Sequence, residues 1–355
     1  MNKSQTQTAR RVLLDWYDRA NLKLPWRGTK DPYRIFVSEL MLQQTRAQTV
    51  VGYYERFLFR WPDVTSLARA QLTDVLKGWE GLGYYARARN LRAASQIVAD
   101  ELGGTFPPDA AGLLRLPGIG EYTAAMIASI AYGECAPAID GNQIRALSRL
   151  FMMDRPARSK EGMAALRAHA MQLIDPARPG DFNQALMDLA RNVCKPKRPD
   201  CGACPLRSFC MGHASGDPAA LPILPKRATQ RIERHGVAIV IARGKVWVKQ
   251  RPEAGLLGGL YVFPHFIDAD SRGAVAEILE ENAIKTKEIG GKMEVEHIFT
   301  HLIWRQKAFA FRAKVCAPLR NGRWVDASQL RALPMTAAHF GFRDWALQLM
   351  EEDGE

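Results

Sequence analysis

The spacing of apolar residues changes once along this chain, and the change divides it into a helical part and a part that contains strands. Up to about residue 193 apolar residues recur at helical spacing, as in EYTAAMIASIAYG, and Gly- and Pro-rich stretches separate the runs. After residue 235 alternation takes over, and GVAIVIARGKVWVKQR predicts a hairpin that turns at Arg243-Gly244. We expect a multidomain chain: an all-α domain over 1–213, a Pro- and Ala-rich linker over 214–233, and a smaller α+β domain over 234–355.

The composition favours a polyanionic partner inside the cell. The 355 residues carry a formal charge of +12, which favours nucleic acid above other partners. The first residues, MNKSQTQTARR, are polar and predict no signal peptide, and no apolar run is long enough to span a bilayer, so we expect no membrane partner. The six cysteines then indicate a reducing compartment, and we expect a cytoplasmic location.

One carboxylate lies inside the apolar segment VSELMLQQT. Asp31 and Pro32 suit the N-cap and the first position of a helix, and apolar residues follow on nearly every face, as in a buried helix. Burial would raise the pKa of Glu39 so that it stays protonated near neutral pH, which makes it a candidate general acid. The alternative is a rim position, or a buried glutamate paired with an arginine.

A tight turn joins two predicted helices in LLRLPGIGEYTAAMIASIAYG. Gly118 and Gly120 would let the backbone expose consecutive N–H groups at the start of the second helix, which suits a phosphate. This helix–hairpin–helix pattern grips the DNA backbone without reading bases. An ordinary αα-corner is the alternative, but the complete string in a basic chain favours DNA.

Asp140 precedes the next predicted helix, which Asn142 could cap. Alone, Asp140 is readily explained as a turn or capping residue. Together with a protonated Glu39, an ionised Asp140 would supply what cleavage of an N-glycosidic bond requires. The acid protonates the departing base, and the carboxylate stabilises the oxocarbenium charge left on the sugar. This reaction needs no metal.

Four cysteines, Cys194, Cys201, Cys204 and Cys210, are spaced C-x6-C-x2-C-x5-C. Four thiols this close together in a reducing compartment predict a metal site. Zinc and a 4Fe–4S cluster both take four cysteine ligands, and the spacing alone does not decide between them.

Seven segments together resemble those of the MutY-type adenine DNA glycosylases of the helix–hairpin–helix superfamily. They are LPWRGTKDPYRIFVSELMLQQT, GLGYYARARNL, LPGIGEYTAAMI, AIDGN, FNQALMDL, the four-cysteine motif and GLLGGLYVFP, and they run over nearly the whole chain. The resemblance implies one 4Fe–4S cluster in place of zinc. It also implies removal of adenine mispaired with 8-oxoguanine or guanine in double-stranded DNA, and we expect a monomer that associates with the nucleoid when bound to DNA.

The resemblance also assigns catalytic roles. Glu39 corresponds to the acid that protonates the adenine ring nitrogen, and Asp140 to the carboxylate that stabilises, or transiently bonds to, the sugar cation. Asn142 corresponds to the neighbour that orients Asp140. Tyr122 stands where related bifunctional enzymes carry the Schiff-base lysine, so base removal without efficient strand cleavage is expected.

Further residues resemble DNA contacts of the family. Leu42 and Gln44 resemble residues that fill the base stack once adenine is flipped out, and Tyr84 resembles an aromatic that stacks beside 8-oxoguanine. Arg27 and Gln184 match adenine-pocket positions. Without the resemblance, packing or surface charge would be the simpler interpretation of Leu42, Tyr84 and Arg27.

The C-terminal domain resembles the Nudix-like module of these enzymes. Three glutamates of the Nudix helix persist in AEILEENAI, but its arginine is replaced by Ala276, so a Mg²⁺-dependent pyrophosphatase is not expected. Phe299, Thr300 and His301 match the family's Phe-Ser-His loop, which reaches the 8-oxoguanine side. Thr300 keeps the hydroxyl of the serine and adds a methyl group.

Three other functions remain as alternatives. The first is an endonuclease-III-like glycosylase/lyase for oxidised pyrimidines, against which Tyr122 argues. The second is a non-catalytic lesion-binding protein, against which the two retained carboxylates argue. The third is a Nudix nucleotide hydrolase, against which the altered Nudix helix argues.

Overall fold

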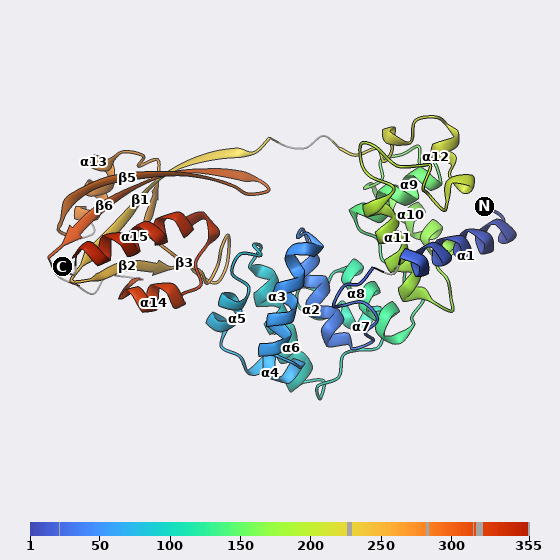
Figure 1. Ribbon diagram of the computed structural model, residues 1–355, viewed down its shortest axis with the longest axis horizontal. Coiled ribbons are helices and arrows are strands. Elements are labelled where there is room, and N and C mark those ends of the chain that lie inside the picture. Colours follow the sequence, from blue (N-terminus) through green and yellow to red (C-terminus); the bar gives the residue numbers. More distant parts are fainter. Residues whose placement is uncertain (21, 226–228, 282–283, 315, 317–321, 354–355) are drawn as a thin grey trace. The chain divides into compact units, whose positions relative to one another are not determined.

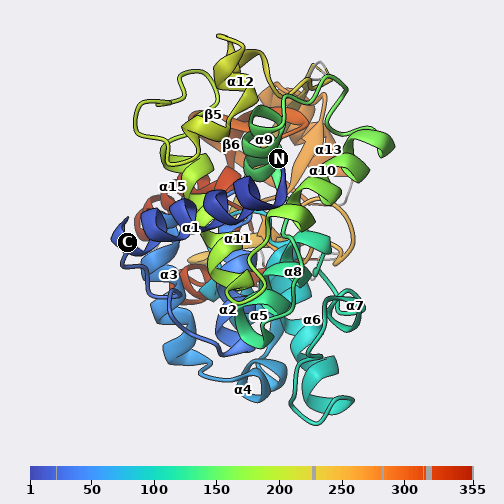
Figure 2. The same cartoon turned by 90° about the vertical axis from the view of Figure 1, so that its right-hand side faces the viewer.

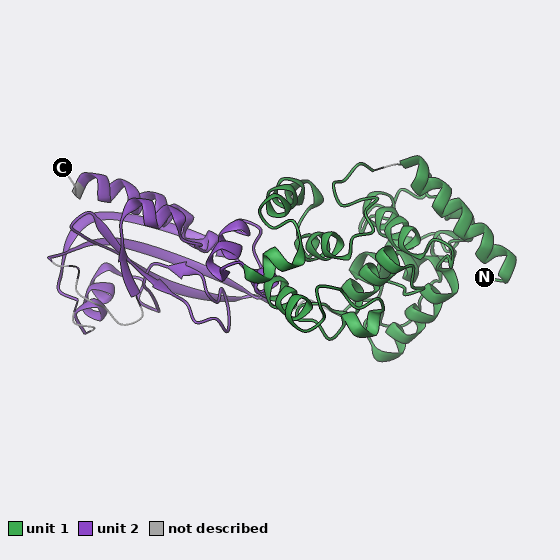
Figure 3. Ribbon diagram, turned by 90° about the horizontal axis from the view of Figure 1, so that it is seen from below, with its two compact units in different colours: residues 1–69, 90–226 green, residues 70–89, 227–355 purple. Residues whose placement is uncertain are grey.

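The structure is a computed structural model that describes residues 1–20, 22–225, 229–281, 284–314, 316 and 322–353. The chain forms two compact units (Figure 3), residues 1–69 with 90–226 and residues 70–89 with 227–355. Residues 70–89 thus group with the C-terminal residues, although they lie inside the helical half of the sequence. Residues 226–228 of the predicted linker and 282–283 in AEILEENAI lie outside the described residues.

The first unit is helical, and none of its described residues is in a strand. Its α-helices (Figure 1) are α1 (Lys3–Ala20), α2 (Pro32–Leu42), α3 (Ala47–Arg60), α4 (Val64–Arg69), α6 (Ala86–Asp100), α7 (Ala110–Leu113), α8 (Glu121–Ile127), α9 (Gly141–Leu150), α10 (Lys160–Leu173), α11 (Pro179–Asn192) and α12 (Met211–Ala214). Shorter elements are the π-helix η1 (Ala128–Tyr132), which continues α8, and the 3₁₀ helices η2 (Arg207–Phe209) and η3 (Pro218–Ala220). No described helix is both long and apolar enough to cross a membrane.

Local sequence signals set the start of α2. The Asp31 carboxylate accepts hydrogen bonds from the backbone N–H groups of Tyr33 (2.9 Å) and Arg34 (3.4 Å), and Pro32 occupies the first helical position. Eight of its eleven residues are buried, and the helix packs against α3 and α8. The predicted cap and the buried character of this helix are therefore confirmed.

A second group of helices packs around α11. This helix contacts α1, α9 and η1, and α10 packs against α1 and α9 (Figure 2). Their apolar faces share a core that includes Leu13, Leu147 and Leu166. Gly180 permits the close approach of α11 to η1, because a Cβ at this position would lie 2.7 Å from the Cα of Ile130. This packing brings α9 and α11 together beside the site described below.

The second unit is built on a mixed sheet whose described strands follow the order β3-β2-β1-β6-β5, with β4 paired to β1 and β7 to β2. β1 and β6 are parallel, and the other pairs are antiparallel. The strands are β1 (Arg231–Ala242), β2 (Lys245–Gln250), β3 (Tyr261–Val262), β4 (His265–Ile267), β5 (Thr286–Ile298), β6 (Leu302–Ala313) and β7 (Gly322–Val325). The helices are α5 (Leu72–Gly78), α13 (Arg272–Glu281), α14 (Ala327–Ala332), η4 (Ala337–His339) and α15 (Phe340–Asp353).

Alternate residues of β1 face opposite layers. Val237 and Ile239 share a core with α14 and α15, whereas Ala238 and Val240 pack against α13. β1 ends and β2 begins on either side of Arg243-Gly244. The predicted hairpin is therefore confirmed, and so is the α+β character of this unit.

Candidate active site

Glu39 is buried in α2, with 6% of its surface exposed. Burial disfavours the charged carboxylate and raises the pKa of Glu39 to about 7, as its apolar sequence context predicts. A hydrogen bond from Tyr122 and the positive charge of Arg27 oppose this rise, while the charge of Asp140 adds to it. Glu39 can therefore carry a proton near neutral pH, which a general acid requires.

Tyr122 comes from the first turn of α8 and hydrogen-bonds Glu39. Burial, followed by the charges of Glu39 and Asp140, raises the pKa of the Tyr122 phenol well above its usual value. The hydroxyl therefore keeps its proton and acts as a donor. It also lies 3.7 Å from the Sδ atom of Met187 on α11, which closes one wall of the site.

Asp140 is the N-cap of α9, and its carboxylate accepts three hydrogen bonds. Oδ1 accepts from the backbone N–H groups of Asn142 (2.7 Å) and Gln143 (2.9 Å), and Oδ2 accepts from the Asn142 side chain (2.8 Å). The Gln143 side chain accepts in return from the Asp140 N–H, which completes a capping box. Of the two residues that the sequence offers as caps of this helix, Asp140 is the cap, and the Asn142 side chain hydrogen-bonds its carboxylate.

A cavity of about 840 Å³ brings these side chains together. Glu39, Tyr122, Asp140 and Asn142 all line it, although they come from three different helices. Its volume lies in the range of small-molecule sites. A nucleoside bound there would meet one carboxyl group that can donate a proton and a second that is held as a hydrogen-bond acceptor.

Three of the predicted DNA contacts, Leu42, Gln44 and Gly120, line the same cavity. Leu42 is the last residue of α2 and is half-buried. Gln44 is exposed and has a φ of 56°, in the left-handed region that few non-glycine residues adopt. The chain therefore turns sharply beside the cavity as it leaves α2, and the turn leaves Gln44 on the surface.

Gly118 and Gly120 have different reasons to be glycine. Gly118 has a φ of +77°, and a Cβ there would lie 2.5 Å from the Cβ of Asn90. Gly120 caps α8 with a φ of −91°, which any residue can adopt, and a Cβ added there would meet no atom within 4 Å. Only Gly118 is thus required for the shape of the turn before α8.

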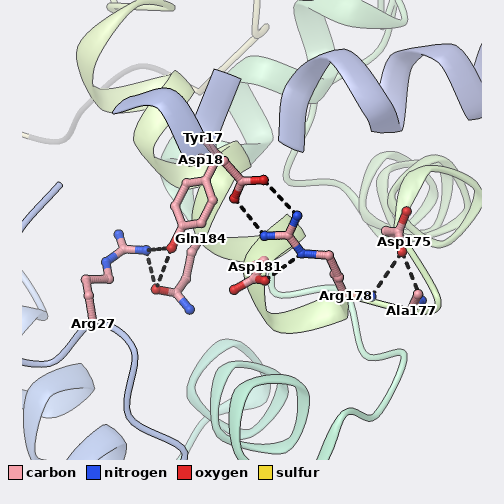
Figure 4. Close-up of polar contacts among 8 residues, drawn as sticks. All are labelled: Tyr17, Asp18, Arg27, Asp175, Ala177, Arg178, Asp181 and Gln184. Carbon is pink, nitrogen blue, oxygen red and sulfur yellow. Dashed lines mark hydrogen bonds and ion pairs between the residues drawn. The ribbon is translucent and has the colours of Figure 1, made fainter. Parts of the chain in front are cut away.

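Arg27 and Gln184, the predicted adenine-pocket residues, are hydrogen-bonded to each other (Figure 4). Arg27 also forms an ion pair with Asp188 (2.9 Å), whose side chain is 1% exposed, and donates to the Tyr17 hydroxyl (3.0 Å). Neither Arg27 nor Gln184 is part of the lining of the 840 Å³ cavity. Their closest tie to the site is the charge of Arg27, which acts on Glu39.

Two residues of α11 that support the site were not predicted. Asp188 fixes Arg27, and it follows Gln184 by one helical turn, a spacing that could have indicated it. Asn183 is 2% exposed, donates to the carbonyl of Ala136 (2.9 Å) and accepts from the N–H of Ala138 (3.1 Å). Asn183 therefore holds the segment that leads into Asp140.

The predicted lesion-recognition residues lie in the second unit. Phe299, Thr300 and His301 join β5 to β6. The Tyr84 hydroxyl lies 2.6 Å from the Thr300 hydroxyl, and the Phe299 ring packs edge-on against Trp304 with centroids 4.9 Å apart. Tyr84, Thr300 and His301 are exposed. The structure thus brings Tyr84 next to Thr300, although the two residues are 216 positions apart in the sequence.

The four cysteines of the C-x6-C-x2-C-x5-C motif line one small cavity, and all are free thiols. Burial, with a smaller contribution from the charges of the other three cysteines, raises the pKa of Cys204 to about 11. A cationic centre would therefore be needed to hold four thiolates there. Arg149, 1% exposed, already donates to the Cys194 Sγ (3.3 Å) and to the carbonyl of Lys195 (2.7 Å).

A chain of hydrogen bonds joins Asp140 to the first cysteine. Asn142 donates to Asp140 and accepts from the Arg145 guanidinium (3.2 Å), which in turn donates to the carbonyl of Cys194 (2.8 Å). Arg145 was not predicted, since a single arginine on a helix carries no signal of its own. The cysteine loop therefore contributes directly to the position of Asn142.

Three family descriptions match this chain. Residues 37–170 match the HhH-GPD superfamily of base excision DNA repair proteins, residues 194–210 the iron-sulfur binding domain of endonuclease III, and residues 236–342 the NUDIX domain. The first range contains Glu39, Tyr122 and Asp140. The second begins and ends on the outer cysteines.

Adenine DNA glycosylases match along nearly the whole chain. The protein of Rattus norvegicus is 34% identical over 93% of this chain and 76% of its own length. The protein of Buchnera aphidicola (strain Sg) is 31% identical over 89% of this chain and 92% of its own length. This chain belongs to the adenine DNA glycosylase family. It spans 57% of the length of the Arabidopsis thaliana family member, to which it is 35% identical.

Solved structures agree with the helical fold of this adenine DNA glycosylase family member. The match to a thermostable thymine-DNA glycosylase covers 60% of this chain and 98% of the chain of that structure, with 27% identity and a TM-score of 0.55. The match to an endonuclease III trapped with DNA covers 61% of this chain and 99% of the chain of that structure, with 21% identity and a TM-score of 0.52. The predicted helix–hairpin–helix glycosylase fold and the Nudix-like second part are therefore confirmed.

The match to the iron-sulfur binding domain of endonuclease III decides between the two metal sites that the spacing left open, in favour of an iron-sulfur cluster. The matched range contains Cys194, Cys201, Cys204 and Cys210, four thiols that suit the ligand set of one 4Fe–4S cluster.

Proposed function

We propose that this protein hydrolyses the N-glycosidic bond of adenine mispaired with 8-oxoguanine or guanine in double-stranded DNA, acting as a monomer and leaving an abasic site. The observation that carries the proposal is the cavity of about 840 Å³ that Glu39 and Asp140 share. The first has a pKa of about 7 and the second is held by three donors. Two carboxyl groups in such different environments suit the roles of acid and charge stabiliser.

Glu39 would start the reaction by giving its proton to a ring nitrogen of the extruded adenine. A neutral purine is a better leaving group than a purine anion, so the glycosidic bond weakens and positive charge develops on the sugar. Asp140 stabilises that charge, and Asn142 keeps its carboxylate in place. A water molecule then adds to the sugar carbon and loses a proton, which leaves the abasic site. The hydrogen bond from Tyr122 lowers the pKa of Glu39 and so partly offsets the effect of burial.

Strand cleavage is not part of the proposal. A lyase needs an amine that forms an imine with the abasic sugar, and Tyr122 carries a phenol whose pKa is raised well above its usual value. The four cysteines would hold the 4Fe–4S cluster, and their loop takes no part in the proton transfers of the hydrolysis. Through Arg145 and Asn142 this loop supports the position of Asp140.

Adenine excision from three duplexes tests the proposed function. Adenine should be released from A opposite 8-oxoguanine and from A opposite guanine, whereas A opposite T should stay intact, because a mispaired base is extruded at lower free-energy cost. Single-turnover assays with alkaline cleavage of the product measure this release. Equal release from all three duplexes, or a protein–DNA adduct trapped by borohydride, would contradict the proposal.

The exposed loop between β5 and β6 is the proposed contact to 8-oxoguanine. His301→Ala should lower the preference for A opposite 8-oxoguanine over A opposite guanine, because only the first substrate offers the oxidised base to this loop. The ratio of the two single-turnover rate constants measures the effect. His297→Ala, in β5 just before the loop and half-buried, is the matched control. A parallel loss on both substrates would argue that His301 has no recognition role.

A further inference from the structure

Arg191 lies in the last turn of α11 and lines the cavity that holds Glu39 and Asp140. It follows Met187 and Asp188 by four and three residues, so all three are on one face of the helix, the face that borders the site. Arg191 is half-buried. Arg191 therefore forms part of the cavity wall and is not fully exposed to solvent.

Arg191 differs from the other arginines of this region in having no acceptor among the described residues. Arg27, Arg145 and Arg149 each donate to named carboxylates or carbonyls. The Arg191 side chain makes no hydrogen bond and no ion pair within the described part of the chain. The positive charge of Arg191 opposes the rise in the pKa of Asp188 that burial causes. Both carboxylate oxygens of Asp188, however, accept hydrogen bonds from Arg27.

A second arginine at the same cavity also has no acceptor for its side chain among the described residues. Arg46 precedes α3, is exposed, lines the cavity, and has neither a hydrogen-bond acceptor for its side chain nor an ion pair among the residues that the structure describes. The carboxylates of the cavity do not need these arginines. Asp140 is satisfied by three donors, and Glu121 is paired with Arg167.

An extruded nucleotide brings its own negative charges to the cavity. Its base can reach Glu39 only if the two phosphodiesters that flank its sugar come to the cavity mouth. Guanidinium groups bind phosphate oxygens through paired N–H donors, and they do so most strongly where water is partly excluded. Two arginines that find no acceptor in the described structure therefore match the two charges that the ligand must carry.

We propose that Arg191 and Arg46 bind the DNA phosphates that flank the extruded nucleotide and so hold its sugar between Glu39 and Asp140. The inference deepens the proposed function and depends on it for the extruded base. It assigns to Arg191 a role in positioning and in none of the proton transfers.

Salt-dependent binding tests the inference without relying on catalysis. Each phosphate contact contributes about 0.9 to the slope with which log Kd rises with log salt. In a Glu39→Gln background, Arg191→Gln should weaken binding to an A:8-oxoguanine duplex about 5- to 20-fold and lower the slope by about 0.9, as for one lost charged contact. Arg46→Gln should act in the same direction, and Arg191→Lys should restore the slope. Fluorescence anisotropy between 50 and 300 mM salt, roughly the range over which such contacts weaken, gives both values.

The matched control is Arg11→Gln, an exposed arginine of α1 that does not line the cavity and should leave Kd and slope within twofold of the parent, about the resolution of such a titration. The effect of Arg191→Gln should also be smaller on a fully paired A:T duplex, which keeps its base stacked. With Glu39 restored, Arg191→Gln should raise the protein concentration for half-maximal excision more than it lowers the maximal rate. An unchanged slope, or a lost maximal rate with unchanged Kd, would overturn the inference. Absence of excision by the wild type would instead overturn the proposed function, while the binding results would still test whether Arg191 contacts a phosphate.

Discussion

Replacing Glu39 with glutamine should abolish adenine excision and leave the lesion duplex bound. The amide has nearly the same shape as the carboxyl group, but it has no acidic proton to give to the purine. General acids contribute about 10²- to 10⁴-fold to a rate, and a purine leaves slowly without protonation, so we expect a loss of at least about 10³-fold. Single-turnover excision and duplex affinity, measured side by side, separate chemistry from binding.

The pH dependence of the wild-type rate gives an independent check on the same residue. Glu39 must be protonated to act, and its pKa is raised by burial to about 7. The rate should therefore be retained below this value and fall about tenfold for each further pH unit above it. A rate that rises between pH 6 and 9 would be incompatible with Glu39 as the acid.

The same substitution should stabilise the folded protein at alkaline pH. Between its unfolded value of 4.5 and about 7 the folded protein keeps a proton on Glu39 that the unfolded chain has lost, so unfolding free energy falls as pH rises. Once both states are ionised, the cost is about 3 kcal/mol. Glu39→Gln has no such titration, so its Tm should exceed the wild-type value at pH 8 and approach it at pH 5. Equal pH dependence of Tm in both proteins would argue against a buried, perturbed Glu39.

Asp140→Asn should cause a similarly large loss of excision, about 10²- to 10³-fold, with little change in stability. Asparagine is as good an N-cap as aspartate, so α9 keeps its start, but the neutral amide cannot stabilise a sugar cation. Single-turnover rates and thermal unfolding at one pH measure the two effects.

The chain contains a close control for this substitution. Asp326 is the N-cap of α14 and forms a capping box with Gln329, as Asp140 does with Gln143. Asp326→Asn therefore makes the same local change far along the sequence from the site, in a residue outside the cavity lining. It should leave excision intact. A large loss of Tm in Asp140→Asn but not in Asp326→Asn would mean that Asp140 has a structural role beyond capping.

Local signals were enough to predict the individual parts of the site. The burial of Glu39 follows from the apolar residues around it, and the start of its helix follows from Asp31-Pro32. The sequence leaves the cap of α9 open between Asp140 and Asn142, because aspartate and asparagine are equally good caps. The Asp140-x-x-Gln143 spacing of a capping box favours Asp140, which is the cap in the structure.

The sequence by itself determined the individual elements, the four-cysteine motif and the apolar surroundings of Glu39 on its own helix, because these depend on residues close together in the chain. Tertiary structure alone decided which of these parts meet. The shared cavity of Glu39 and Asp140, the Asp188 pair of Arg27, the contact of Tyr84 with Thr300 and the place of Arg191 in the cavity wall all join segments far apart in the chain. Such contacts depend on how α2, α8, α9 and α11 pack and on how the strands of the second unit are paired. The helical or strand periodicity of the sequence does not specify that packing.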